Sequence, residues 1–466
     1  MASPRVAPKS SHKNFLNDRK IAAYASAGLR RRRLGAAKFP DVNLLLLYSM
    51  PHYKIHLIYI FKCGGSMALM TIDEPTVSGQ GKPSPMHHPL WALGFRPFYL
   101  LAAAFAAVSI PLWLAGYFGL VPGLANVNVN WHMHEMVFGF AIAVIIGFLF
   151  TAGRNWTGLW TPRRGHLAML AGVWLAGRIA MLAAPALLAA LVDILFLPLA
   201  AWPMYRVLQR SGNKRNMFVI GLLSLLTLVN ILFHLAVMGW IAVPPVLTIQ
   251  AAILIVVMIE SVMGGRIIPG FTSNTVPGTK PIVNPGRDRL TIALTALASL
   301  AWIFTLPPRL IAALAFAAAC SQLLRLGGWK PHTTLRHPLL WILHLSYAWI
   351  PCGFLLMALA ALQVVPANSA FHVLAIGSMA GLIIGMMTRT TLGHTGRRLK
   401  AGRNEVLMYG LIQIGVVARF YAAIDTAGLR DGALLVAAAS WSAAFVFFLV
   451  VYGPYLYRPR LDGKEG

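Results

Sequence analysis

Apolar stretches long enough to cross a lipid bilayer recur from about residue 90 to the C-terminus, separated by short polar segments. A membrane-spanning helix needs about 20 residues, because each residue adds about 1.5 Å across a hydrocarbon layer about 30 Å thick. Helices satisfy their backbone amides internally, as lipid requires, and no strand pattern competes with them. We therefore predict an all-α, polytopic bundle of about twelve transmembrane helices, at residues 91–118, 131–152, 165–184, 186–208, 216–239, 244–265, 288–306, 308–325, 338–361, 369–391, 404–425 and 430–457.

A weak internal repeat suggests that these helices form three sets of four. Helix 1 opens with HPLW at residues 88–91 and helix 9 with HPLLW at residues 337–341. Helices 2, 6 and 10 each end with a glycine and an arginine, namely Arg154, Arg266 and Arg389. These arginines are expected either to anchor their helix ends at the membrane surface or to bind an anionic group such as a propionate or a phosphate.

Positive charge is distributed very unevenly between the two sets of connections. The second, fourth, sixth, eighth and tenth connections hold 19 Lys and Arg residues, whereas the others hold only Arg309 and Arg430. Because basic loops remain in the cytoplasm, this alternation predicts that both termini are cytoplasmic. A missed or an invented helix would break the alternation, so the asymmetry also supports the count of twelve.

Composition agrees with a membrane protein. Hydrophobic residues make up 58% of the chain and charged residues 11%, and the mean hydropathy is +0.67, which leaves too little polar surface for a soluble protein of 466 residues. The net charge of +27 reflects membrane orientation rather than nucleic-acid binding. Three scattered cysteines form neither a disulfide framework nor a cysteine zinc site. The lipid bilayer is therefore the expected partner, and the sequence does not indicate an oligomeric state.

Residues 1–86 differ from the rest, and we treat residues 87–466 as the transmembrane domain. The first 66 residues hold 12 of the 40 Lys and Arg residues and two apolar runs of about seven residues, too short to span a bilayer. We expect this leader to be disordered or to come from an over-extended gene start, with Met67 or Met86 as the true first residue.

Histidines near one end of three predicted helices are the main candidates for chemistry. His132 and His134 open helix 2, His234 lies near the end of helix 5, and His372 lies near the start of helix 10, all close to the predicted periplasmic face. Glu135 follows them directly, and Asp193 of helix 4 lies in the same half. Ionisable groups inside a membrane are costly, and neutral imidazole is a common ligand of haem iron, copper and zinc.

The spacing of the first two histidines limits this site. Two residues correspond to about 200° around a helix, so His132 and His134 are not expected to bind one metal from the same face. One would bind metal while the other packs or forms a hydrogen bond. Glu135 would either orient a ligand histidine or interact with the helix N-terminus, and the sequence does not decide between these roles.

A second group of candidates lies toward the predicted cytoplasmic side. His344 lies about six residues, or roughly 9 Å, into helix 9, where it would bind a metal or form a hydrogen bond between helices. His337 and His394 lie in loops, and Glu260 on helix 6 is expected to pair with Arg266. The absence of CxxCH, Walker A and HExxH motifs argues against covalent haem, a nucleotide-driven pump and this type of zinc site.

Six segments together resemble the bacterial NnrS family: HPLWALGFRPFYLL (88–101), WHMHEMVFGF (131–140), GFLFTAGRNWTG (147–158), GGRIIPGFTSN (264–274), HLSYAWIP (344–351) and MTRTTLGHTGR (387–397). The resemblance extends from about residue 87 to the end, and WHMHEMVFGF and GGRIIPGFTSN are its most specific parts. It implies a multi-pass inner-membrane protein of bacteria that contains haem, b-type and non-covalent, and copper. It also implies a link to denitrification and to the nitric oxide response.

The histidines in matching motifs are His132, His134, His344 and His394, whereas His234 and His372 come from helix depth alone. We therefore expect cofactor binding by His132, His134, His344 and His372 with Arg154, Arg266 and Arg389, and metal binding by all six histidines. If the protein is an enzyme, it would be a metal-dependent oxidoreductase acting on nitric oxide. Nitric oxide binding or sensing without turnover stays open.

Two other functions remain compatible with the sequence. Twelve helices with internal repeats and buried Asp193, Glu260 and Arg178 would also suit a secondary transporter without a metal. A helper subunit without a cofactor is the third possibility. A haem absorption band and bound copper would separate the metalloprotein from both.

Overall fold

The computed structural model describes residues 58–63, 66–71, 85–124 and 126–464. The chain divides into two compact units, Met1–Lys82 and Pro83–Gly466. In the first unit, strands β1 (Ile58–Cys63) and β2 (Ser66–Thr71) form an antiparallel pair that begins with Ile58 opposite Thr71. These strands lie in the leader that we expected to be disordered, and the other residues of that leader, apart from Pro85 and Met86, lie outside the described residues.

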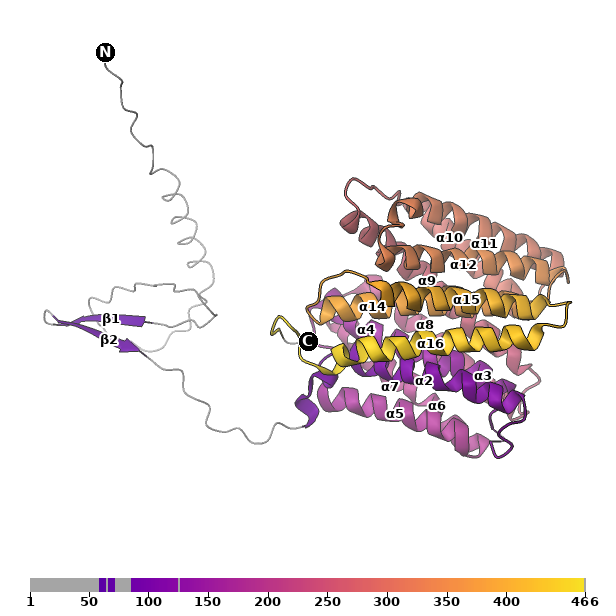
Figure 1. The fold of residues 1–466 in the computed structure, drawn as a ribbon, viewed down its shortest axis with the longest axis horizontal. Helices are drawn as coiled ribbons and strands as arrows, with labels where there is room; N and C mark the ends of the chain where they lie inside the picture. Colours follow the sequence, from indigo (N-terminus) through magenta and orange to yellow (C-terminus); the bar gives the residue numbers. More distant parts are fainter. Residues whose placement is uncertain (1–57, 64–65, 72–84, 125, 465–466) are drawn as a thin grey trace, which may run out of the picture. The chain divides into compact units, whose positions relative to one another are not determined.

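The second unit is a helical bundle (Figure 1). Its elements in chain order are η1 (Pro85–His87), η2 (Pro89–Trp91), α2 (Phe95–Tyr117), α3 (Val129–His134), η3 (Glu135–Ala141), α4 (Ile142–Thr157), α5 (Arg164–Ala183), α6 (Ala186–Ile194), α7 (Phe196–Arg210), η4 (Lys214–Asn216), α8 (Phe218–Val237), α9 (Pro245–Thr275), α10 (Pro285–Ile303), α11 (Pro308–Gly328), η5 (Pro331–Thr334), α12 (Pro338–Ala361), α13 (Ala367–His372), η6 (Val373–Ala380), α14 (Gly381–His394), α15 (Arg403–Ile424) and α16 (Arg430–Tyr457). Several of them join end to end, so the described residues form twelve long helical segments, as the hydrophobic pattern predicts.

Eleven of these segments are long and apolar enough to cross a membrane, and the chain is a multi-pass membrane protein. The exception among the described residues is α10, which has the charged residues Arg287, Asp288 and Arg289 within its first five positions. Its polar face is satisfied inside the protein, because Thr291 bonds to Ser321 at 2.6 Å. The segment therefore packs as a helix of the bundle although its composition is more polar.

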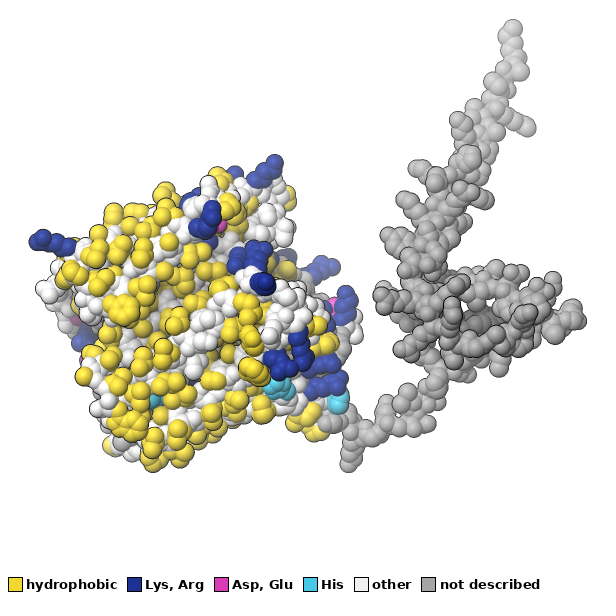
Figure 2. Space-filling view, turned by 180° about the vertical axis from the view of Figure 1, so that it is seen from behind, with side chains coloured by type: hydrophobic (Ala, Val, Ile, Leu, Met, Phe, Trp, Pro, Cys, Tyr) yellow, Lys and Arg dark blue, Asp and Glu magenta, His cyan; other side chains and the backbone are white. Residues whose placement is uncertain are grey.

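On the face that Figure 2 shows, hydrophobic side chains cover most of the bundle, and Lys and Arg gather mainly at one end. We call this end the basic end, and the opposite one, where α3 and α13 begin, the α3 end. Large hydrophobic side chains are exposed on most of the long helices, as expected for helices that face lipid. This distribution follows the alternation of charged connections along the sequence.

The two most deeply buried spans are Val129–Thr157 and Ala367–His394. In their apolar windows 83% and 78% of the residues are buried, against 33% in α15. The segments share another feature: η3 and η6 are π-helical, whereas α9, the corresponding span of the middle set of four, is α-helical throughout. Single π-helical turns within α-helices occur frequently at functional sites. Here each begins directly after a histidine, His134 or His372.

Candidate metal and histidine sites

At the α3 end of the bundle, the span Val129–Thr157 begins with the segment that contains Trp131, His132 and His134. Asn128 caps α3, because its side-chain oxygen accepts hydrogen bonds from the backbone N–H groups of Asn130 and Trp131 at 2.9 and 3.1 Å. The helix therefore starts just before His132 and His134. The two histidines enter different environments, as their spacing of about 200° predicts.

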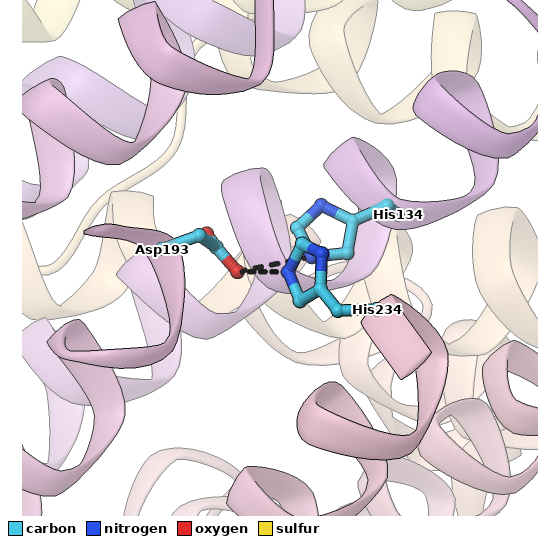
Figure 3. Close-up of side chains that lie close together, drawn as sticks. All are labelled: His134, Asp193 and His234. Atoms are coloured by element: carbon cyan, nitrogen blue, oxygen red, sulfur yellow. Dashed lines mark hydrogen bonds and ion pairs between the residues drawn. The ribbon is translucent and has the colours of Figure 1, made fainter. Parts of the chain in front are cut away.

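His134 belongs to a buried group of side chains that we call the polar cluster. Five helical elements contribute to it: α3, η3, α5, α6 and α8. Its members are His134, Glu135, Arg178, Asp193, Asn230 and His234, whose exposed fractions are all 6% or less. In Figure 3 the carboxyl group of Asp193 lies on one side and faces the rings of His134 and His234 on the other. The prediction that Glu135 and Asp193 lie near the histidines of this half therefore agrees with the geometry.

Hydrogen bonds occupy both ring nitrogens of His134. Its Nδ1 lies 2.9 Å from Oε1 of Glu135, and its Nε2 lies 2.9 Å from Oδ1 of Asn230 and 3.1 Å from Oδ2 of Asp193. The amide nitrogen of Asn230 donates to Asp193 at 2.8 Å, which fixes its oxygen toward His134. All these neighbours accept hydrogen bonds, so in this arrangement both nitrogens of His134 donate.

Charge in the cluster balances when His134 carries both protons. Arg178 donates to Oε2 of Glu135 at 2.7 Å and also to Oδ1 of Asp193. Two carboxylates then face one guanidinium and one imidazolium. Balance matters here because an uncompensated buried charge is strongly destabilising. His234 completes the group through its Nε2, which lies 3.1 Å from Oδ2 of Asp193.

Three members of the polar cluster have the arrangement of a metal site. One ligand atom each from His134, Asp193 and His234 lie within 4.8 Å of one another. Two imidazole nitrogens and a carboxylate oxygen suit copper or zinc. Glu135 lies behind His134 and Arg178 holds the other oxygen of Asp193, which is the outer support that such ligands usually have. A metal here would replace the proton on Nε2 of His134.

The other histidines of this end, His132 and His372, line an apolar cavity of about 170 Å³ that we call the histidine cavity. Its walls include Trp113, Gln250, Asn368, Trp441, three methionines (Met133, Met136 and Met379) and Arg419. The ring of His132 stacks on Trp113 with centroids 4.1 Å apart, and its buried Nδ1 has no hydrogen-bond partner among the described residues.

His372 has a fixed tautomer. Its Nδ1 donates to the backbone oxygen of Asn368 at 2.8 Å, so Nε2 keeps a lone pair. Histidines that bind metals commonly donate from their second nitrogen to a carbonyl in this way. His132 and His372 therefore both offer an imidazole nitrogen to the same cavity. In His134, by contrast, both ring nitrogens form hydrogen bonds.

The remaining sequence candidates lie elsewhere. His344 is buried, with Nε2 2.9 Å from the hydroxyl of Thr272, which is the bond between helices considered from the sequence. His394, which we expected in a loop, is the last residue of α14 and is half-buried beside Phe95, with ring centroids 5.7 Å apart. Glu260 forms no described ion pair with Arg266, contrary to our expectation, because Arg266 donates instead to Asn216 at 2.8 Å.

The three repeated arginines each lie over an aromatic ring near the basic end. Arg154 lies 3.0 Å from the ring centroid of Trp160, and Arg389 lies 3.9 Å from that of Phe271. Arg266 lies 4.9 Å from that of Phe218. No described contact joins the three guanidinium groups. They are remote from the histidine cavity, whose lining includes a different arginine, Arg419.

Two members of the polar cluster did not appear among the sequence candidates for this site. Arg178 was noted only as a buried residue compatible with a transporter, and Asn230 was not noted. A usable signal did exist for Arg178, because a guanidinium inside a span requires an acidic partner, and Glu135 and Asp193 lie at similar depth. Asn230 precedes His234 by one helical turn, so it lies on the same face.

A bundle of apolar helices with a buried polar cluster and a histidine-lined cavity defines a multi-pass membrane protein with candidate metal sites. Comparison with known families matches residues 89–460 to the family described as NnrS protein, and the chain belongs to the NnrS family. This membership supports a membrane protein linked to the nitric oxide response. No curated protein matches the sequence.

Proposed function

We propose that this protein binds haem and copper in the bacterial inner membrane and serves the nitric oxide response through them. The single observation that carries the proposal is the pair of histidines in one apolar cavity, His132 and His372, each with a ring nitrogen free to bind. Family membership supports the link to nitric oxide. Nitric oxide is small and neutral, so it can enter the cavity from lipid without a polar channel.

The histidine cavity has the groups that a non-covalent haem needs from a protein. Imidazole nitrogens would bind the iron, apolar walls would cover the ring, and the guanidinium of Arg419 would pair with a propionate. A volume of about 170 Å³ admits a diatomic gas, whereas a porphyrin requires the side chains of Met133, Met136 and Met379 to move aside. Methionine suits such adaptation because it has three rotatable bonds. The iron would supply the atom that binds nitric oxide.

The polar cluster has the groups that copper needs. His134, Asp193 and His234 would be its ligands, with Glu135 orienting His134. Copper would supply a second centre capable of one-electron chemistry. Because binding must displace the proton on Nε2 of His134, we expect the copper affinity to fall as the pH falls, with proton release on binding. Titration calorimetry in two buffers of different ionisation enthalpy measures that release.

Purified protein tests the proposal directly. We expect an absorption spectrum of haem and bound copper by elemental mass spectrometry. His132→Phe or His372→Phe should remove the haem band and keep copper, whereas Asp193→Asn should remove copper and keep the haem. A folded protein without haem or copper would refute the proposal and favour a transporter or a helper subunit.

The distribution of charge supports an orientation with both termini in the cytoplasm. In this orientation the basic end faces the cytoplasm, and the polar cluster and histidine cavity lie toward the periplasm. Reporter fusions test it: a fluorescent protein fused after Lys464 should fold and fluoresce, and alkaline phosphatase inserted after Gln363 should be active. The reverse pattern would overturn the orientation.

A further inference from the structure

A second cavity lies farther along the same central helices, and we call it the central cavity. It has a volume of about 100 Å³ and lies between the spans that contain α4, α9 and α14, with contributions from α2 and α12. Its lining consists of aliphatic, methionine and phenylalanine side chains, one glycine, and two titratable groups, Tyr99 and Glu260. An acidic side chain in such a place is expensive to retain, so it calls for a function.

Glu260, a partly buried residue, is unlike the buried carboxyl groups that the structure describes, Glu135, Asp193 and Glu405. Glu135 and Asp193 bind Arg178, and Glu405 accepts hydrogen bonds from the N–H of Gly402 at 2.6 Å and the hydroxyl of Tyr452 at 2.7 Å. Glu260 contacts the hydroxyl of Ser378, but its Oε2 is buried with no described hydrogen-bond partner. The lining of the cavity contains no Lys, Arg or His.

These surroundings determine the protonation of the carboxyl group. An ionised carboxylate in an apolar cavity without a cation or several donors loses its hydration with little in return. The neutral acid avoids that loss, and its O–H can still donate to a small polar molecule in the cavity. We propose that the central cavity is a proton-binding site, in which Glu260 carries the proton.

The position of this site connects it with the α3 end of the bundle. On α9, Ile253 lines the histidine cavity and Glu260 lines the central cavity, seven residues or about 10 Å farther along the helix. The side chain of Met379 lines both cavities. Met379 therefore belongs to the wall that the two cavities share, which places Glu260 next to the cavity proposed to bind nitric oxide. Proton binding itself does not depend on haem or copper.

A carbodiimide soluble in lipid tests the proposal, because such reagents modify carboxyl groups in their protonated form. The purified full-length protein is treated at pH 7, digested and mapped by mass spectrometry. We expect Glu260 to be modified about tenfold more than Glu135 and Glu405, which are buried and have charged or donor partners. Equal modification of the three groups, or none at Glu260, would overturn the proposal.

Infrared spectroscopy supplies a second measurement that does not depend on access of the reagent. Glu260→Gln keeps the size of the side chain and should lose both the adduct and the carbonyl band of a protonated carboxyl group. The matched variant Glu405→Gln should keep both. If Glu260→Gln retains the band unchanged, the proton is not at Glu260 and the proposal fails, whatever metals the protein contains.

Discussion

His132 and His134 are separated by a single residue, yet the polar cluster and the histidine cavity use them in opposite ways. His134 has acceptors on both ring nitrogens and forms part of a balanced group of charges. His132 has an aromatic neighbour and a buried nitrogen without a described partner. The role of a buried histidine in a membrane protein therefore depends on the groups that its ring nitrogens face, and not on its depth in the bilayer.

The two regions also differ in what they demand of the fold. In the polar cluster each charge is compensated by another member, so removing one member harms the rest. In the histidine cavity the walls are apolar and the histidines stand apart from such a network. Changes in the cluster should therefore reduce stability first, whereas changes in the cavity should reduce ligand binding first.

The largest expected effect is that of Arg178→Met. This change leaves Glu135 and Asp193 with only the charge of His134, and an uncompensated buried charge costs about 3–5 kcal/mol. Thermal unfolding in detergent, followed by intrinsic fluorescence, measures the loss. Adding Glu135→Gln to Arg178→Met should recover part of it, because the second change removes the surplus negative charge.

Arg206→Met is the matched control. Arg206 is exposed and lies 5.8 Å from the ring centroid of Trp202. Its replacement should change the stability by no more than about 0.5 kcal/mol. Equal stability of the two single variants would show that the polar cluster is not the balanced network described above.

A smaller difference in stability is expected between the variants in which His134 or His132 is replaced by Phe. His134→Phe leaves the acceptors on Glu135, Asn230 and Asp193 without their donor, so we expect a loss of about 3 kcal/mol. His132→Phe keeps the stacking on Trp113 and should cost about 1 kcal/mol or less. Equilibrium unfolding of both variants in one detergent measures the difference. A His132→Phe variant as unstable as His134→Phe would contradict the contrast.

The smallest effect concerns the packing around the cluster at Gly139. A Cβ at this position would lie 2.7 Å from both Nη1 of Arg178 and Oε2 of Glu135 and 2.8 Å from a ring carbon of Phe105. We therefore expect Gly139→Ala to cost about 1–2 kcal/mol through overpacking. Gly172→Ala, where a Cβ meets nothing within 4 Å, is the control and should be neutral or slightly stabilising. Equal melting temperatures for the two variants would contradict close packing at Gly139.

Hydrophobic periodicity was sufficient to predict the fold class and the twelve helical segments. It works in this chain because lipid imposes both the length and the apolarity of each span. It was less decisive for α10, whose Thr291, Thr295 and Asp288 bond to polar side chains of α11. A polar face that is satisfied by a neighbouring helix has no signature in a hydropathy pattern.

The candidate site was predicted in part. Depth along the helices was enough to group His134, His234, Glu135 and Asp193, because rise per residue is a constant of the helix. Depth does not give rotation about the helix axis, so it also grouped His132 and His372 with them, although they face another space. The pairing of Arg178 with two carboxylates depends on how five elements pack, and one sequence does not specify that packing.

The π-helical segments η3 and η6 have a consequence for insertions and deletions. Such a segment corresponds to one extra residue within an otherwise α-helical span, and one residue amounts to about 100° of rotation. Deleting a single residue from η6 would restore regular α-helix at the cost of turning α13 relative to α14, so that His372 would no longer face its cavity. One extra residue is ordinarily a defect in a transmembrane helix. Here it directs the imidazole of His372 toward the histidine cavity.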